Sequence, residues 1–349
     1  MPPALAQTAD KVKIAPMISG LDAPWALAHL PSGAVLVTER DGRLLHWQDG
    51  KSFEVQGVPI IDANGQGGLL DITLPRDFAQ SRQVFLTYAK PQARGNGTAL
   101  AVARLSQDGR QLIDLQDLFE MTPGSSGGRH FGSRVVEAVD GTLFVTIGDR
   151  GERDTAQNLS RHNGSIVRIN RDGSVPADNP FVKHGNARPE IWSFGHRNPQ
   201  GAGLDQNGRL WTSEHGARGG DEVNIITKGA NYGWPLISYG RHYSGAKIGL
   251  GTANEGMQQP AHYWDPSIAP SGLLVYSGAM FPGWQGDILI GSLKFDYIAR
   301  LRVTGETATE IAQIKSPETS RVRDIVQAPD GSIWFISVGN GTVYRMTPD

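Results

Sequence analysis

One pattern of apolar and polar positions recurs along this chain and indicates short β-strands. A turn glycine comes first, alternating apolar residues follow, and a small or polar residue stands where the run ends. Short runs bounded by turn residues are typical of strands rather than helices. Five copies begin at a glycine turn and a sixth lacks the glycine: they occupy residues 31–38, 140–146, 207–213, 285–291, 330–336 and, without the glycine, 83–88.

The spacing of these copies predicts the architecture. The interval from Gly33 to Gly141 is about twice the roughly 40 to 50 residues of one propeller blade, and the glycine-free copy falls inside it. Each copy is also followed by a second short strand after a turn. We therefore expect an all-β fold, a single six-bladed β-propeller of four-stranded antiparallel blades over residues 19–349, with an N-terminal tail over residues 1–18. A pair of β-sandwiches is the competing fold, but no linker-like segment divides the chain.

Composition excludes several classes of function. The 33 basic and 35 acidic residues are mixed along the chain and give a net charge of −2, so nucleic acid is not an expected partner. No apolar run reaches the roughly 18 to 20 residues of a membrane span. Cysteine is absent, which excludes disulfides and thiolate metal sites. Residues 4–7 resemble the end of a secretory signal peptide, which predicts a periplasmic or secreted protein, with a random tail of small residues as the alternative.

The propeller interpretation also predicts where function lies. We expect the repeated strands to line the central channel, so that polar residues just past their ends gather at one mouth. Counted from the turn glycines, the residues at such positions are Glu39, Asp149, His215 and Lys294. These side chains are predicted to converge around one cavity.

Two glycine-rich loops carry single polar residues. Gln66 lies in segment 64–70, and His130 lies in segment 127–132, immediately before a predicted strand. We expect the His130 loop to be flexible and to expose its imidazole for catalysis. The alternatives are a plain turn for the first loop and a surface histidine for the second.

Segment 193–201 combines an imidazole, a guanidinium and an amide within a sharp turn. Gly195 and Pro199 fix the turn, which directs Arg197 and Asn198 to the same side. Such a cluster is typical of a binding pocket. A purely structural network of the same groups is the alternative.

Two further segments offer carbonyl oxygens and cations. Residues 214–222 form a glycine-rich loop with backbone carbonyls, the ligand type that calcium prefers, unless the loop is only a flexible connection. Arg321 and Arg323 begin a predicted strand and share one of its faces, because successive side chains alternate. With Lys294 they form a cationic wall suited to carboxylates, with solvated surface charges as the alternative.

Together these segments resemble the soluble aldose sugar dehydrogenases that use pyrroloquinoline quinone (PQQ), the family that includes soluble quinoprotein glucose dehydrogenase. The likeness runs from about Gly20 to Met346, and the segments that carry it are 65–69, His130 with 146–149, 195–201, 221–224 with 229–235, 268–271, 292–294 and 321–324. The resemblance implies a six-bladed propeller that binds PQQ and Ca²⁺. It implies oxidation of aldoses at C1 to the lactone by proton abstraction and hydride transfer to C5 of the quinone, with electrons passed to an external acceptor, a quinone or a dye.

The resemblance also implies roles for individual residues. His130 matches the general base and Asp149 the carboxylate that orients it, while Arg197 and Asn198 match residues that hydrogen-bond the quinone oxygens. Gln66 matches an amide near the reacting sugar hydroxyl. Lys294, Arg321 and Arg323 match the residues that pair with the cofactor carboxylates, and His215 matches a position beside the cofactor. The carbonyls of Gly216 and Ala217 match ligands of the calcium ion on the quinone. Glu222 and the carbonyl of Tyr232 match ligands of a second calcium ion.

Departures from the family pattern leave substrate preference open. The glucose-oxidising member has aspartate and glutamine where this chain has Arg129 and His215, and the loops between blades look short. These differences predict a wider cleft that accepts several aldoses, including disaccharides, in a monomer or weak dimer. A calcium-dependent lactonase and a non-catalytic sugar-binding propeller are the alternatives. The cationic trio distinguishes them from the dehydrogenase, because a neutral sugar alone does not need it.

Overall fold

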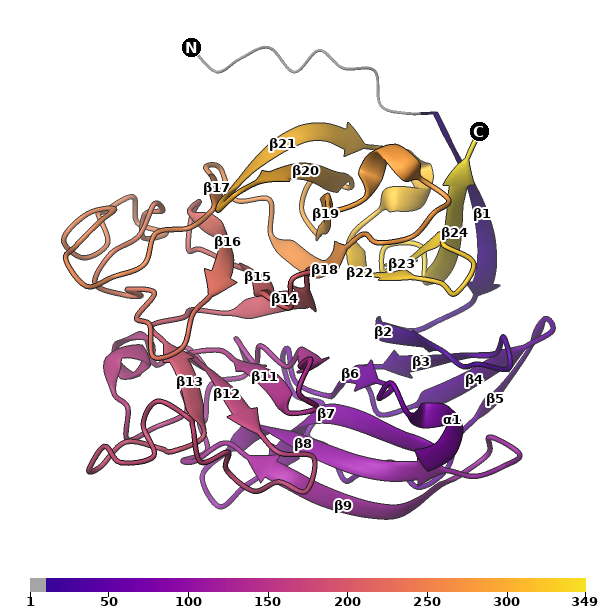
Figure 1. Ribbon diagram of the computed structural model, residues 1–349, viewed down its shortest axis with the longest axis horizontal. Coiled ribbons are helices and arrows are strands. Elements are labelled where there is room, and N and C mark those ends of the chain that lie inside the picture. The colour runs from indigo at the N-terminus through magenta and orange to yellow at the C-terminus, as the bar shows by residue number, and fades with distance from the viewer. Residues whose placement is uncertain (1–10) are drawn as a thin grey trace.

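The computed structural model describes residues 11–349 and contains six four-stranded antiparallel sheets around a central channel (Figure 1). The six-bladed propeller predicted from the sequence is therefore confirmed. The first three blades are formed by β2 (Pro24–His29), β3 (Val35–Glu39), β4 (Leu44–Gln48) and β5 (Lys51–Glu54); by β6 (Leu69–Thr73), β7 (Gln83–Pro91), β8 (Asn96–Leu105) and β9 (Leu112–Glu120); and by β10 (Val135–Glu137), β11 (Leu143–Ile147), β12 (Ser165–Ile169) and β13 (Ile191–Phe194).

The other three blades continue in chain order, and the last one takes its outer strand from the beginning of the chain. They are formed by β14 (Pro199–Leu204), β15 (Leu210–Glu214), β16 (Asp221–Ile226) and β17 (His262–Trp264); by β18 (Pro270–Val275), β19 (Ile288–Ser292), β20 (Ile298–Thr304) and β21 (Thr307–Ile314); and by β22 (Val322–Gln327), β23 (Ile333–Ser337), β24 (Thr342–Pro348) and β1 (Val12–Ser19). Short helices lie in the connections: α1 (Phe78–Ser81), η1 (Arg153–Gln157), η2 (Pro282–Trp284) and η3 (Pro317–Thr319). Among the residues described, none of these helices has the length and apolarity to cross a bilayer.

The channel is lined by the first strand of each blade. The first strand of every blade contacts the first strand of both neighbouring blades, which closes the inner ring. The prediction that the repeated glycine-led strands line the channel is wrong, because those runs form the second strands, such as β3, β11 and β15. Second strands are covered on both sides by neighbouring strands and on both faces by other blades, which explains their nearly unbroken burial.

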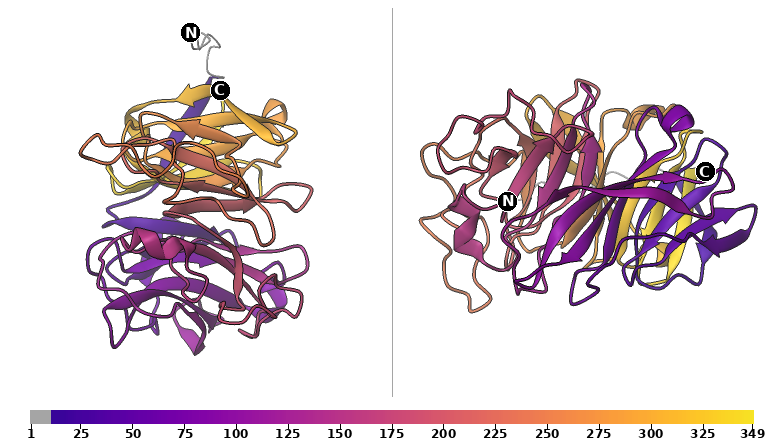
Figure 2. Two further views of the ribbon diagram at one scale, coloured as in Figure 1. Left: turned by 90° about the vertical axis from the view of Figure 1, so that its left-hand side faces the viewer. Right: turned by 90° about the horizontal axis from the view of Figure 1, so that it is seen from below.

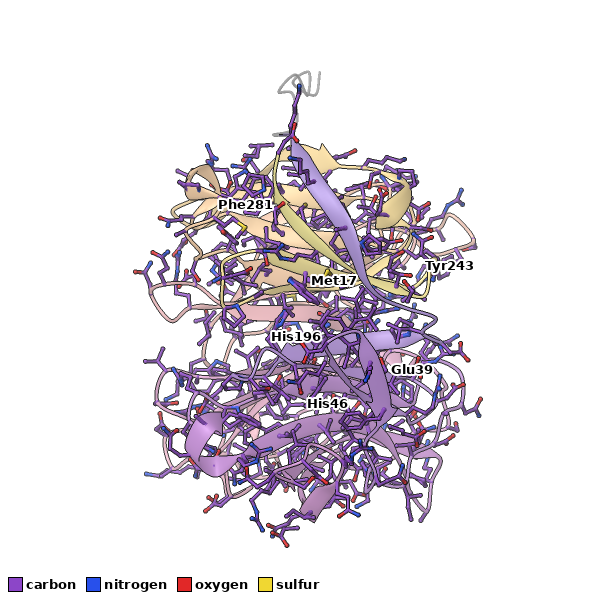
Figure 3. The ribbon with its side chains drawn as sticks, turned by 90° about the vertical axis from the view of Figure 1, so that its right-hand side faces the viewer. Met17, Glu39, His46, His196, Tyr243 and Phe281 are labelled. Atoms are coloured by element: carbon purple, nitrogen blue, oxygen red, sulfur yellow. The ribbon has the colours of Figure 1, made fainter. Side chains whose placement is uncertain are left out.

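The ring closes where β1 pairs with β24, from Val12 opposite Pro348 to Ser19 opposite Thr342. Figures 1 and 2 show these indigo and yellow ends of the chain together, and Figure 3 labels Met17 on β1. The prediction of a tail over residues 1–18 is therefore wrong for residues 12–18, which supply backbone hydrogen bonds and the apolar side chains of Ile14 and Ile18 to the last blade. The candidate signal-peptide remnant, residues 4–7, lies outside the described residues.

Hydroxyl groups tie consecutive blades together. The polar residue at the end of the repeated sequence pattern donates a hydrogen bond to a backbone carbonyl on or just before the inner strand of the next blade. Four blades in succession use this contact: Thr38 to Leu70 at 2.6 Å, Thr87 to Ser133 at 2.6 Å, Thr146 to Pro199 at 3.0 Å and Ser213 to Ser271 at 2.9 Å. The repeated Ser or Thr therefore serves blade packing.

One connection is long and lies at the rim of the channel. Residues 227–261 join β16 to β17 within the fourth blade, so this long connection is separate from the loops between blades, which the sequence analysis expects to be short. The chain within this connection is ordered by backbone hydrogen bonds, including Leu250 N–H to the carbonyl of Leu236 at 2.7 Å. It rises on the side of the molecule where the candidate site lies.

Arg134 links blades across the channel. It lies just before β10 and contacts Asp71 at 2.7 Å and Asp324 at 3.0 Å, which belong to the second and sixth blades. Its guanidinium also lies over the ring of Trp25 in the first blade and donates to the carbonyl of Gln200 in the fourth. Burial raises the pKa of Asp71 to about 6. Burial by itself would lower the pKa of Arg134, but the negative charges of Asp324 and Asp71 raise it above its usual value.

Replacing Arg134 should strongly destabilise the propeller. The Arg134→Met variant leaves Asp71 and Asp324 buried without a counter-ion, so we expect its free energy of unfolding to fall by about 3–5 kcal/mol, measured by denaturant unfolding. The matched control Arg104→Met removes the exposed pair with Asp114 and should cost no more than about 1 kcal/mol. Equal losses in the two variants would contradict this role for Arg134.

Candidate active site

A cavity of about 1050 Å³ occupies one mouth of the channel and is lined by residues from all six blades. It brings together most of the residues singled out in the sequence, as far apart in the chain as Gln66 and Arg323. The predicted residues that line it are Gln66, Asn198, His215, Gly216, Ala217, Lys294, Arg321 and Arg323. Of the strand-end residues expected at this mouth, His215 and Lys294 are present, whereas Glu39 is buried in an ion pair with Arg43.

His130 and Asp149 form a pair beside the cavity. Nδ1 of His130 lies 2.6 Å from Oδ1 of Asp149, and only 12% of the histidine side chain and 1% of the aspartate side chain are exposed. The second carboxylate oxygen of Asp149 accepts a hydrogen bond from the indole of Trp234 at 2.8 Å. The carboxylate is therefore fixed from two sides and fixes the imidazole in turn.

Backbone geometry brings His130 to this position. His130 has φ of 55°, a conformation that is uncommon for a residue with a side chain, and its N–H donates to Oε1 of Gln66 at 2.8 Å. The loop approaches the end of β11 closely because Gly148 has no Cβ, which would overlap the carbonyl oxygen of His130. The expectation that this loop exposes the imidazole is therefore wrong, because only 12% of the His130 side chain is exposed.

The pKa values of the pair favour a neutral imidazole next to an ionised carboxylate. Burial lowers the pKa of His130 below its usual value, although the hydrogen bond to Asp149 acts in the opposite direction. Burial alone would raise the pKa of Asp149, but the hydrogen bonds from His130 and Gly151 hold it below its usual value. Asp149 accepts at Nδ1 of His130, which leaves the lone pair on Nε2; this tautomer is assigned from the hydrogen-bond partners.

Two amides are oriented by their own hydrogen bonds. Oδ1 of Asn198 accepts from the N–H of Gly132 at 3.1 Å and from Gln200 at 3.3 Å, so the Nδ2 donors of Asn198 remain for the cavity. Oε1 of Gln66 is similarly occupied by His130, which leaves the Nε2 donors of Gln66. Both side chains therefore present hydrogen-bond donors to a ligand.

The neighbouring Arg197 is held by a buried network. Its N–H donates to Glu214 at 2.8 Å, and its guanidinium donates to the carbonyl of His215 at 3.2 Å. His196 is fully buried between Ser193 and Glu214, and Figure 3 labels it in the interior. Within segment 193–201 the histidine is thus structural and Asn198 lines the cavity, whereas Arg197 is buried and lines a separate small void behind it.

Cations concentrate on the opposite wall of the cavity. Arg323 donates to Gln200 at 2.7 Å, Arg321 donates to the carbonyl of Leu293 at 3.0 Å, and Lys294 lies beside them. Burial, together with the positive charges of Arg134, Arg321 and Arg40, lowers the pKa of Arg323 to about 9. A ligand with several carboxylates would relieve this repulsion.

Buried polar atoms without partners also indicate a missing ligand. Among residues 11–349, Nε2 of His215 and Nε of Arg40 find no hydrogen-bond partner although both side chains line the cavity. Burial lowers the pKa of His215 to about 3, so its imidazole is neutral. Unsatisfied buried polar groups are costly, so this wall fits a polar ligand such as the quinone cofactor.

Two places fit the predicted calcium ions. Gly216 and Ala217 line the cavity beside His215, where their backbone carbonyls are the predicted ligands. Glu222 and Tyr232 instead line a separate void of about 10 Å³ together with Glu214. Burial and the charge of Glu214 raise the pKa of Glu222 to about 8, which is the environment that a bound cation would neutralise.

Several residues of this site carry no role in the sequence analysis. Trp234 fixes Asp149, Glu214 fixes Arg197, and Gln200 bridges Arg323 and Asn198. Glu214 stands at the end of a repeated strand, one residue before His215, so its position was a usable signal. No local pattern identifies Trp234, because its contact with Asp149 joins positions 85 residues apart.

Comparison with known proteins gives consistent matches over nearly the whole chain. The chain is 44% identical over 336 residues to the aldose sugar dehydrogenase YliI of Escherichia coli (strain K12), covering 94% of this chain and 91% of that protein. The crystal structure of the soluble aldose sugar dehydrogenase of Escherichia coli in its apo form superposes with a TM-score of 0.93 at 42% identity, covering 97% of this chain and 100% of that one.

A second solved structure contains the cofactor. The PQQ-bound form of the aldose sugar dehydrogenase of Streptomyces coelicolor has a TM-score of 0.79 at 25% identity, covering 97% of this chain and 99% of that one. The model of the Glucose / Sorbosone dehydrogenase family matches residues 21–345. This protein therefore belongs to the Glucose / Sorbosone dehydrogenase family.

Proposed function

We propose that the protein oxidises aldose sugars at C1 to the lactone, with PQQ and calcium bound in the channel cavity. The observation that carries the proposal is the His130–Asp149 pair at 2.6 Å beside a cavity walled by Lys294, Arg321 and Arg323. When bound, the quinone would supply a two-electron acceptor for the hydride that leaves the sugar. The aldose sugar dehydrogenases among the relatives support this activity.

In this proposal Nε2 of His130 takes the proton from the anomeric hydroxyl. Loss of this proton, with departure of hydride from C1, leaves the carbonyl group of the lactone. Because burial keeps the pKa of His130 below its usual value, the imidazole is unprotonated and ready to act at neutral pH. Asp149 holds the ring in the required tautomer and stabilises the imidazolium that forms.

Oriented donors complete the proposed machinery. The Nδ2 group of Asn198 and the guanidinium of Arg197 would donate to the cofactor oxygens, where negative charge develops. The Nε2 group of Gln66 would donate to the reacting sugar hydroxyl. Lys294, Arg321 and Arg323 would pair with the cofactor carboxylates, with neutral His215 as a further contact.

The two calcium assignments belong to the same proposal. The carbonyls of Gly216 and Ala217 would hold the ion at the cofactor, while Glu222 and the carbonyl of Tyr232 would hold a structural ion. We further propose that electrons leave to an external quinone or dye, and that the protein acts in the periplasm or outside the cell as a monomer or weak dimer. A lactonase on this fold would need a metal held by several carboxylates and amides in the channel, whereas Asp265 is the one carboxylate among the described residues that line this mouth, and six lining residues are Arg or Lys.

The His130→Ala variant should retain the cofactor but lose turnover. With calcium and PQQ added, the absorbance of the quinone should bleach when an aldose is added to the wild type, and the bleaching rate in the variant should fall by about 10²–10⁴. The exposed His184→Ala variant is the matched control and should bleach at the wild-type rate. A wild-type rate in His130→Ala would remove His130 as the base, and absence of cofactor uptake by the wild type would refute the proposed function.

The pH dependence of kcat/KM should report on the same pair. Activity should fall only as pH drops through the lowered pKa of His130, so the acidic limb should lie below the ordinary imidazole value of about 6.5. Asp149→Asn removes a group that raises this pKa, so the limb should move to still lower pH while the plateau falls by about 10²–10⁴. An acidic limb above pH 7 in the wild type would contradict the assignment.

Removing one cation should weaken cofactor binding selectively. We expect Lys294→Met to raise the Kd for PQQ by about 10- to 100-fold, because a charge-assisted hydrogen bond is lost. Fluorescence titration of the calcium-loaded protein measures this, and the affinity of the variant should depend less on salt concentration. Lys51→Met on the outer strand β5 is the control and should bind as the wild type does; an unchanged Kd in Lys294→Met would remove Lys294 from the proposed site.

A further inference from the structure

A hairpin places Tyr243 at the rim of the cavity. The N–H of His242 donates to the carbonyl of Ala246 at 2.9 Å, and the N–H of Gly245 donates to the carbonyl of His242 at 2.8 Å, which closes the turn. Tyr243 lines the cavity, yet it is 74% exposed, and its hydroxyl has no hydrogen-bond partner among residues 11–349. In Figure 3 it lies at one edge of the molecule, on the opposite side from Phe281.

Two contacts with other segments of the chain hold the hairpin in place. Arg241 forms an antiparallel bridge with Arg218, whose N–H donates to the carbonyl of Arg241 at 3.0 Å. On the other side, the guanidinium of Arg153 lies 3.2 Å from Nε2 of His242. The tyrosine ring is therefore presented by an ordered turn, which is bridged to Arg218, the residue that follows Ala217 in the chain.

Three charged side chains without partners line the same cavity as Tyr243. Arg218, Arg241 and Asp265 line the same cavity, and within the described part of the chain none of their side chains forms an ion pair or hydrogen bond. Asp265 lies against Gly219, where a Cβ would overlap its carboxylate oxygen. Three charged groups and an exposed aromatic ring are thus available to a ligand at the outer end of the cavity.

These groups have the chemistry that recognises a sugar ring. An aromatic face packs against the apolar C–H face of a pyranose, a carboxylate accepts hydrogen bonds from hydroxyls, and guanidinium groups donate to hydroxyl and ring oxygens. A quinone or dye could stack on Tyr243 as well, but it offers no hydroxyl donors for Asp265.

We propose that Tyr243, with Arg218, Arg241 and Asp265, forms an outer subsite for the second sugar unit of a disaccharide or longer oligosaccharide. The unit at the reducing end would lie deeper in the cavity, beside His130. This inference rests on the proposed function, because it extends the substrate of that same reaction. Tyr243 then sets the preference between oligosaccharides and monosaccharides.

The test compares maltose with glucose in the calcium- and PQQ-loaded protein. In Tyr243→Ala we expect kcat/KM for maltose to fall about 5- to 10-fold, mainly through a higher KM, while kcat/KM for glucose changes less than about 2-fold. Tyr243→Phe keeps the ring and should behave as the wild type, because the hydroxyl is not hydrogen-bonded. The subsite would be overturned if kcat/KM fell equally for both sugars or did not fall for maltose. It would also be overturned if only the KM of the electron acceptor changed.

A binding measurement separates this inference from the proposed reaction. Methyl α-maltoside has no free anomeric hydroxyl and cannot be oxidised, so saturation-transfer NMR reports its binding alone. We expect the signals of its non-reducing unit to be strongest in the wild type and to weaken in Tyr243→Ala. If neither maltose nor glucose is oxidised but this pattern holds, the reaction is refuted and the subsite stands; if the signals are absent or equal in both proteins, the subsite is refuted.

Discussion

The buried ion pairs of Arg134 are the constraint on which this propeller depends. One guanidinium from the third blade satisfies carboxylates of the second and sixth blades and packs against an indole of the first. Three charges removed from water are tolerable only when each has its partner, so the blades must keep their relative positions. The same arginine lies directly below the candidate site, where Gln200 and Trp25 line the cavity and where its charge lowers the pKa of Arg323.

The side chains of the candidate site are also fixed by contacts between blades. Its polar side chains stand on strand ends and on short loops that are fixed by hydrogen bonds to neighbouring blades, as Gln66 fixes His130 and Gln200 fixes Asn198. Such positioning lets neutral amides present only their donor groups to the cavity, and it keeps His130 neutral beside an ionised Asp149. The cationic wall, by contrast, is electrostatically unfavourable by itself, which is why it indicates an anionic ligand rather than a contribution to stability.

The exposed hairpin lies at the rim of the cavity, above the residues of the proposed reaction centre. The long connection after β16 carries an exposed aromatic hairpin, and this hairpin is held by a backbone bridge to Arg218 and one contact with Arg153. A propeller can therefore keep its reaction centre constant while the rim alters which sugars reach it. In this proposal Tyr243 at the rim selects the sugar, whereas His130 deeper in the cavity carries out the reaction.

The sequence by itself determined the blade count, the strand type and the set of polar segments, because glycine turns, alternating apolar runs and clustered functional groups are local patterns. It also indicated that His130, Arg197 and Lys294 belong to one site, since their segments depart from the blade pattern. Local patterns could not tell which strand of a blade lines the channel, because that depends on the order of strands in the sheet. They also could not show that residues 12–18 close the ring or that His130 is buried against Asp149 and Gly148. These properties, and the partners Trp234, Glu214 and Gln200, come from contacts between distant parts of the chain, which only the closed ring brings within hydrogen-bonding distance.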